Sequence, residues 1–202
     1  KELNEKLQKE KIDVTLPGQY VPRGHVHPLT STTNEICSIF QSLGFSVVPD
    51  EFAPEVETEY YNFDMLNVPK DHPARDMQDT FYTNVAENVV LRSQTSGAQI
   101  HAMEGKNPPI RIIAPGRVYR NENINSRKNN FFHQIEGLYV DKNITFGDLK
   151  GVLNEFIRIY FGESRPTRFR SSFFPFTEPS AEVDVQCIMC SGKGCRTCSG
   201  TG

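Results

Sequence analysis

Four cysteines near the end of the sequence have the spacing of a metal site. Cys187 and Cys190 belong to one C-x-x-C-x-G-x-G repeat, and Cys195 and Cys198 belong to a second that follows directly. Each C-x-x-C turn can present two thiolates to one ion, and the glycines let the backbone approach the sulfurs closely. We therefore predict a closed structural Zn²⁺ site. An iron–sulfur cluster, a redox pair and four reduced thiols are the alternatives.

A second group of charged residues flanks a long polar loop. Arg120 and Glu122 lie at the base of this loop, and Arg127 and Lys128 lie at its tip. A guanidinium group offers a fixed fork of donors that suits a phosphate chain, and the loop could close over such a ligand. A surface hairpin held by salt bridges would contain the same residues.

An aromatic segment ends in a carboxylate. In an extended strand, Phe174, Phe176 and Glu178 would share one face because side chains alternate with period two. An apolar slot that ends in a carboxylate would fit an aromatic amino acid beside a phosphate bound by Mg²⁺, which takes one or two protein carboxylates. The alternative is an aromatic core with a solvated carboxylate.

The elements that must position these residues are short strands and amphipathic helices. In the strand expected over 132–140, Gln134 and Glu136 share a face with apolar residues, and buried polar side chains need partners. Other strands are expected over 45–48, 80–83, 110–114, 117–120, 168–170, 173–176 and 181–185. Helices are expected from a capping box at Thr32 to Gly44, over 96–104, and from a capping box at Thr145 to residue 160. Hairpin-length connections favour an antiparallel α+β fold.

Composition and charge exclude several classes of protein. The chain has 202 residues, a net charge of −3, 37% hydrophobic residues and 23% charged residues. These values exclude a basic nucleic-acid clamp, a disordered acidic tail and a membrane protein, and the first residues lack a signal peptide's apolar stretch. We expect a cytoplasmic protein. We interpret His101 as a surface histidine and the acidic residues of 51–59 as a solvated face.

Seven blocks, in order along the chain, resemble the family of bacterial phenylalanyl-tRNA synthetase α subunits. They are IDVTLPG (12–18), GHVHP (24–28), HPARD (72–76), LRSQTS (91–96), RIIAPGRVYRN (111–121), FHQIEG (132–137) and FFPFTEP (173–179). The resemblance implies a class II aminoacyl-tRNA synthetase catalytic fold, an antiparallel sheet flanked by helices. Residues 1–12 would end an N-terminal helical arm, 13–186 would form the catalytic domain, and 187–202 would be an inserted tandem zinc knuckle.

The resemblance also implies roles for individual residues. Residues 119–122 look like the second signature motif of the class, which would make Arg120 the α-phosphate contact and Glu122 an adenine-side contact of ATP. Arg127 and Lys128 stand in the phosphate loop, where many members have Thr-His. The amino and carboxylate groups of phenylalanine would be held by Ser96, Gln99, Gln134 and Glu136. Its ring would pack against Phe174 and Phe176, and Glu178 would bind Mg²⁺.

The activity implied is ATP-dependent formation of phenylalanyl-adenylate and transfer of the acyl group to tRNA(Phe), in an α₂β₂ heterotetramer with a β subunit. Residues 44–69 look like the first motif of the class, which serves the subunit interface. The third motif is expected downstream of Gly202, so we do not expect the chain alone to form adenylate. Gln94 stands where some members have His. The alternative function is a non-catalytic, synthetase-like module that binds RNA or protein through the zinc knuckle.

Overall fold

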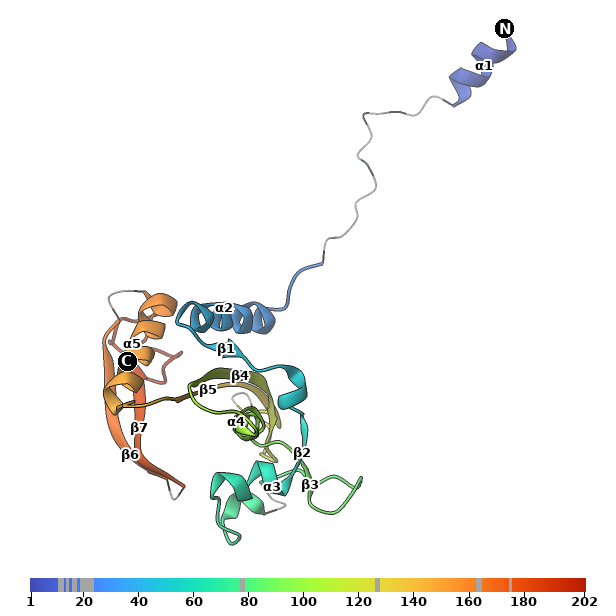
Figure 1. Ribbon diagram of the computed structural model, residues 1–202. Helices are drawn as coiled ribbons and strands as arrows, with labels where there is room; N and C mark the ends of the chain where they lie inside the picture. Colours follow the sequence, from blue (N-terminus) through green and yellow to red (C-terminus); the bar gives the residue numbers. More distant parts are fainter. Residues whose placement is uncertain are drawn as a thin grey trace.

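The computed structural model describes residues 1–10, 13, 15, 18, 24–76, 79–125, 128–162, 165–174 and 176–202 (Figure 1). Its helices are α1 (Glu2–Lys9), α2 (Pro28–Ser42), α3 (Glu59–Asn62), α4 (Gly97–Met103) and α5 (Phe146–Phe161), with 3₁₀ turns at Asp50–Phe52, Asp64–Leu66 and Pro73–Arg75. Its strands are β1 (Ser46–Val47), β2 (Val56–Thr58), β3 (Val89–Leu91), β4 (Ile110–Tyr119), β5 (Phe131–Val140), β6 (Thr167–Phe174) and β7 (Thr177–Val185). Within the described ranges, no helix is both long and apolar enough to span a bilayer.

The central sheet has the strand order β1-β4-β5. β4 and β5 are antiparallel along their whole length, from Ile110 opposite Val140 to Tyr119 opposite Phe131, whereas the short β1 is parallel to β4. The two strands expected over 110–114 and 117–120 are therefore one strand. Pro115 is tolerated inside it because β1 pairs only with residues 112–113, so β4 has no strand on that side at the proline.

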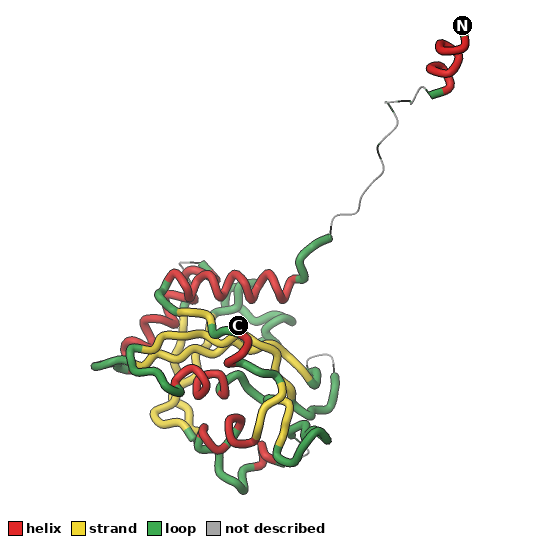
Figure 2. Tube along the Cα trace, turned by 45° about the vertical axis from the view of Figure 1, so that its right-hand side comes forward, coloured by secondary structure: helices red, strands yellow, loops and turns green. Residues whose placement is uncertain are grey.

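Two helices cover one side of this sheet, where α2 lies beside β1 and α5 (Figures 1 and 2). Phe40 of α2 stacks on Phe156 of α5 with ring centroids 5.1 Å apart. The expected capping box at Thr32 is wrong. α2 begins at Pro28 and is capped by the His27 ring, because proline suits the first helical position, where no partner for an N–H is needed. The capping box at Thr145 and the positive φ of Gly44 (86°) are confirmed.

A smaller antiparallel pair, β2–β3, lies beside α3 (Figure 1). α4 lies between this pair and the central sheet. Ala98 of α4 belongs to a buried cluster with Val48 and Ala114, so α4 packs on the central sheet. The strand expected over 80–83 is wrong. That segment makes an isolated bridge from Tyr82 to Val90, because its pairing with the three-residue β3 is limited to two backbone hydrogen bonds, from Thr83 N–H to Val89 O and from Leu91 N–H to Phe81 O.

The third pair is the hairpin β6–β7, which leads into the cysteine segment. The strands expected over 168–170 and 173–176 are one strand that ends at Phe174, because the chain must turn before β7 begins at Thr177. After β7, the backbone N–H of Gln186 donates to Pro166 O at 3.1 Å, and that of Cys187 donates to Gly202 O at 2.9 Å. The cysteine segment thus closes on itself at the open end of the hairpin.

Candidate active site and metal centre

Glu136 is the centre of a polar cluster between β5 and α4. Ser96 Oγ and Gln99 Nε2 both donate to Glu136 Oε2, at 2.7 and 2.8 Å. Ser96 immediately precedes α4 and Gln99 lies in its first turn, so the start of one helix carries both donors to the strand. Burial raises the pKa of Glu136, and the hydrogen bonds from Ser96 and Gln99 oppose that rise. Four of the expected site residues meet here, since Gln134 lies two positions earlier on the same face of β5.

Gln134 contributes an acceptor with no partner. Its Oε1 atom is buried and makes no hydrogen bond within the described part of the chain. Buried polar atoms are almost always paired, so an orphaned acceptor beside a buried carboxylate is unusual. The two side chains together offer an environment for a positively charged donor.

A cavity of about 1000 Å³ is lined by Arg120, Glu122 and Lys128, whereas Ser96, Gln99, Gln134 and Glu136 are not among the described residues that line it. Lys128 Nζ lies 2.7 Å from Glu122 Oε2, and this contact lowers the pKa of Glu122. Arg120 Nε donates to Ser93 O at 3.3 Å, and its guanidinium lies 5.0 Å from the Phe132 ring centroid. Arg120 and Lys128 therefore place two positive charges at one wall of the cavity, which suits a phosphate chain. Arg127 lies outside the described residues.

Phe174 and Phe176 come together, although not on one strand face as expected. Phe174 ends β6 and Phe176 follows in the turn, yet their ring centroids are 6.0 Å apart with the planes tilted by 33°. Phe176 lines the cavity, and the side chain of Phe174 is 41% exposed. Glu178 is exposed on β7 and is not among the described residues that line the cavity. Its carboxylate is an oxygen ligand of the kind that Mg²⁺ takes.

His72 and Gln94 also line the cavity. Neither is among the expected substrate contacts, although Gln94 stands where some members of the family have His. The His72 ring meets the Phe176 ring edge-on, with centroids 5.9 Å apart, and its Nδ1 accepts the N–H of Ala74 at 3.1 Å. Gln94 Nε2 donates to Asn62 O at 2.9 Å. The only signal for His72 is its place in a family block, since the segments that carry His72 and Phe176 are distant in the chain.

Arg92 is a buried structural link that periodicity could not reveal. Its side chain is hydrogen-bonded to Arg117 O through Nε, at 2.7 Å, and to Ala53 O through a terminal nitrogen. Desolvation lowers the pKa of Arg92. This guanidinium therefore joins the loop before β2 to β4, which ends at Tyr119, next to Arg120.

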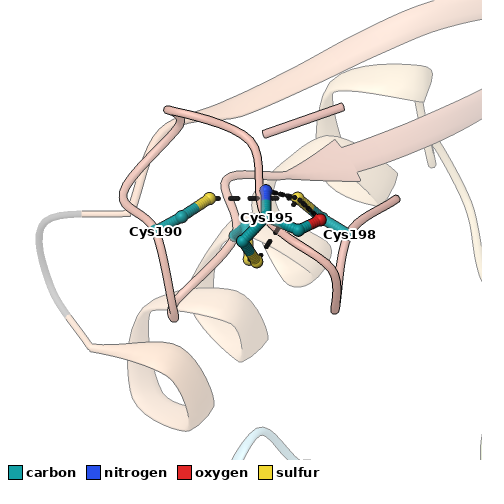
Figure 3. A group of neighbouring side chains, drawn as sticks. Cys190, Cys195 and Cys198 are labelled. Atoms are coloured by element: carbon teal, nitrogen blue, oxygen red, sulfur yellow. Dashed lines mark hydrogen bonds between the residues drawn. The ribbon is translucent and has the colours of Figure 1, made fainter. Parts of the chain in front are cut away.

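The four cysteine sulfurs lie within 4.8 Å of one another, and Figure 3 shows those of Cys190, Cys195 and Cys198. Cys187 and Cys195 sulfurs are 3.9 Å apart, those of Cys190 and Cys198 are 3.8 Å apart, and those of Cys195 and Cys198 are 3.7 Å apart. A tetrahedral site with Zn–S bonds of about 2.3 Å has sulfurs separated by about 3.8 Å. These three separations match those around one tetrahedral ion.

Backbone groups support the same cluster. The N–H groups of Cys195 and Gly202 donate to Cys198 Sγ at 3.1 and 3.2 Å, and these backbone hydrogen bonds lower the pKa of Cys198 to about 6. Gly194 has φ +85°, and a Cβ added there would lie 2.7 Å from Gly200 O. Glycine is required at this point because the two repeats approach backbone to backbone.

Comparisons with known proteins match this architecture. A family model of the class II core domain of tRNA synthetases (F) matches residues 11–202. The phenylalanine–tRNA ligase alpha subunit of Gloeobacter violaceus is 59% identical over 197 residues, which are 98% of this chain and 56% of that protein. The subunit of the same name from Caldicellulosiruptor bescii is 54% identical over 201 residues, which are 100% of this chain and 58% of that protein. The chain thus spans little more than half the length of these relatives.

The solved structures extend the likeness at the level of the fold. Pyrrolysyl-tRNA synthetase from Desulfitobacterium hafniense aligns with a TM-score of 0.59 and 18% identity, covering 78% of this chain and 55% of the other. A second structure of that protein, of its PylSc form, aligns with a TM-score of 0.57. The expected α+β fold, with antiparallel sheets and flanking helices, is confirmed. The chain belongs to the family of class II core domains of tRNA synthetases (F), and the subunits to which it is most similar in these comparisons are phenylalanine–tRNA ligase alpha subunits.

Proposed function

We propose that the protein containing this chain forms phenylalanyl-adenylate from phenylalanine and ATP and transfers the acyl group to tRNA(Phe). The observation that carries this proposal is the Ser96–Gln99–Glu136 cluster beside the orphaned Oε1 of Gln134. An α-ammonium group would supply the missing donor and the missing positive charge. The names and the high identity of the relatives support the same assignment.

The amino acid would lie between this polar cluster and the two aromatic rings. Glu136 and Gln134 would accept hydrogen bonds from the ammonium group, and Ser96 and Gln99 would help to orient the amino and carboxylate groups. The ring would meet Phe174 and Phe176, where offset or edge-on packing adds about 0.5–1.5 kcal/mol beyond burial. A tyrosine hydroxyl in an apolar slot would lose its water partners, at a cost of about 1–3 kcal/mol.

The chemistry needs positioning and electrostatic stabilisation, with no covalent intermediate on the protein. The carboxylate of phenylalanine attacks the α-phosphorus of ATP, pyrophosphate leaves, and the acyl group then passes to the terminal ribose of the tRNA. Arg120 would hold the α-phosphate, Glu122 the adenine side, and Lys128, with Arg127, the rest of the phosphate chain. When bound, Mg²⁺ supplies positive charge at the phosphate oxygens, and Glu178 is the carboxylate that would hold it.

A partner subunit is part of the proposal. The segment 44–69, which resembles the first motif of the class, exposes Val56, Tyr60 and Met65 by 52%, 49% and 41%. Large exposed apolar side chains of this kind are typical of protein interfaces. We propose that this face meets other subunits of an α₂β₂ heterotetramer.

The cysteine cluster is proposed to hold a structural Zn²⁺ ion. The sulfur separations favour one four-coordinate ion, and all four ligands come from the chain, so no open position is left for a substrate. Elemental analysis of protein purified under reducing conditions should find one zinc per chain. Iron in the same analysis, or no metal, would contradict the zinc assignment.

The test of the main proposal is pyrophosphate exchange by the full-length subunit, assembled with its partner, with Arg120→Ala as the variant. Loss of the phosphate contact should lower kcat/KM on the order of 10²–10³-fold, the effect of removing one preorganised charge-stabilising group. Arg158→Ala is the matched control, because Arg158 pairs with Glu155 on the surface of α5. Unchanged exchange in Arg120→Ala would instead favour the non-catalytic RNA- or protein-binding module.

The isolated chain gives a second, independent measurement. We expect no pyrophosphate exchange from residues 1–202 alone, because the glycine-rich third motif, with an arginine for the far end of ATP, is expected further along the subunit. Measurable exchange by this chain would show that the third motif is not required.

A further inference from the structure

The face of α4 opposite the candidate substrate cluster is held by a hydrogen bond between the half-buried His101 and the buried carboxylate of Glu57. His101 Nε2 lies 2.8 Å from Glu57 Oε2, and the two side chains are only 18% and 8% exposed. Thr58 N–H donates to the other carboxylate oxygen of Glu57 at 2.8 Å. The expectations that His101 is a surface residue and that Glu57 lies on a solvated face are therefore wrong. Glu57 is the inward residue of β2, between two exposed neighbours.

Tyr61 extends this contact along the helix. Its ring lies over the His101 imidazole with centroids 3.9 Å apart, and its hydroxyl donates to Glu104 Oε1, at the end of α4, at 2.9 Å. At the beginning of α4, a Cβ added to Gly97 would lie 3.4 Å from Tyr61 O. α3 and β2 thus touch α4 at its start, its middle and its end.

The position of α4 decides whether the substrate cluster forms. α4 has only seven residues, and a helix this short is not stable without tertiary contacts. Gln99 and His101 are two residues apart, so they point to nearly opposite sides of the helix. Gln99 reaches Glu136 on β5, and His101 reaches Glu57 on β2. A shift of the helix toward either side would break one of these contacts.

We infer that Glu57 and His101 are positioning residues, which fix α4 so that Ser96 and Gln99 meet the amino acid substrate at Glu136. The pair joins α4 to β2, and Gln99 of the same helix reaches Glu136. We therefore expect the pair to act on the amino acid and not on ATP, whose candidate contacts Arg120 and Lys128 lie in the segment that follows β4. This inference rests on the proposed function.

The experiment compares His101→Leu with His101→Gln in the full-length subunit assembled with its partner. Leucine removes the donor to Glu57, whereas the glutamine amide places an N–H donor close to the position of Nε2. We expect His101→Leu to raise the KM for phenylalanine in pyrophosphate exchange on the order of tenfold. The KM for ATP should stay within about twofold, and His101→Gln should restore the KM for phenylalanine.

A merely structural role has a different signature. Loss of folded enzyme would lower kcat and leave both KM values unchanged, and that result would overturn the inference. If His101→Leu does not assemble, Glu57→Ala removes the acceptor and tests the same contact from the other side, with Glu155→Ala on the surface of α5 as the matched control. If the wild type catalyses exchange and neither variant changes the KM for phenylalanine, the positioning role is rejected and the proposed function is not. No exchange by the wild type rejects the proposed function, and with it this inference.

Discussion

Burial of the Glu136 carboxylate lowers the stability of the folded state. Its pKa is raised because burial disfavours the carboxylate, despite the hydrogen bonds from Ser96 and Gln99. A carboxyl group with a raised pKa in the folded state destabilises that state above the folded pKa. Below the ordinary pKa it is protonated in both states and the cost disappears. In the proposed site, a substrate ammonium would offset this cost.

Glu136→Gln should therefore stabilise the free protein at neutral pH. Glutamine keeps the shape and an acceptor for Ser96 while removing the buried charge, so we expect Tm at pH 7 to rise by about 2–4 °C. The rise should shrink as the pH falls through the Glu136 pKa, and phenylalanine-dependent exchange should be lost. Thermal unfolding monitored by circular dichroism at several pH values measures the first effect. Glu35→Gln, on the exposed side of α2, is the control. A lower Tm at pH 7 for Glu136→Gln would contradict the stated role of burial.

At the scale of elements, the path of β4 depends on one glycine. A Cβ at Gly116 would meet the terminal nitrogen of Arg92 and lie 3.0 Å from its Cζ. The Arg92 side chain cannot move away cheaply, because its guanidinium is buried and bonded to backbone carbonyls on both sides. The contact between Gly116 and Arg92 thus fixes the position of β4 relative to the loop before β2. It thereby fixes the position of Arg120, which follows β4.

Gly116→Ala should lower the free energy of unfolding by about 1–3 kcal/mol, the usual cost of overpacking. Gly151→Ala is the matched comparison, because a Cβ there meets nothing within 4 Å and the site lies inside α5. Alanine at this helical position should stabilise the protein by about 0.5–1 kcal/mol. Urea unfolding of both variants checks the pair of effects. Equal changes in both would mean that Arg92 can move aside from its contact with β4.

On the scale of the whole molecule, we expect the cysteine segment to unfold independently of the central sheet. The segment is tied to the hairpin at Gln186 and closed on itself from Cys187 to Gly202, with its sulfurs directed at one another. Among the described residues of this segment, the cysteines and the backbone around them are the parts that are not exposed. A bound ion would therefore stabilise this segment locally, without supporting the central sheet.

Metal removal should unfold this segment alone. A chelator under reducing conditions, or Cys190→Ser, should increase hydrogen exchange over 187–202 while β4 and β5 keep their protection. Mass spectrometry of exchanged peptides makes the comparison, and metal content is measured on the same samples. Loss of protection throughout the central sheet would show instead that the ion holds the whole domain together.

What the sequence determined by itself is local in character. The capping box at Thr145, the helix stop at Gly44, the strand alternation that places Gln134 and Glu136 on one face, and the two cysteine repeats each depend on residues a few positions apart. Backbone geometry converts such spacings directly into structure. The family blocks then connected these local features to a fold and a set of expected site residues.

Only the tertiary structure decided which distant segments meet. It brought Ser96 and Gln99 to Glu136, placed His72 against Phe176, and placed His101 against Glu57. It also ended the strand expected over 173–176 at Phe174, and it replaced the strand expected over 80–83 by a single bridge. Periodicity reports which face of an element is apolar, but the partner of that face is chosen by packing among elements far apart in the chain. For that reason the sequence predicted the candidate substrate residues, but it did not predict the contacts that position them.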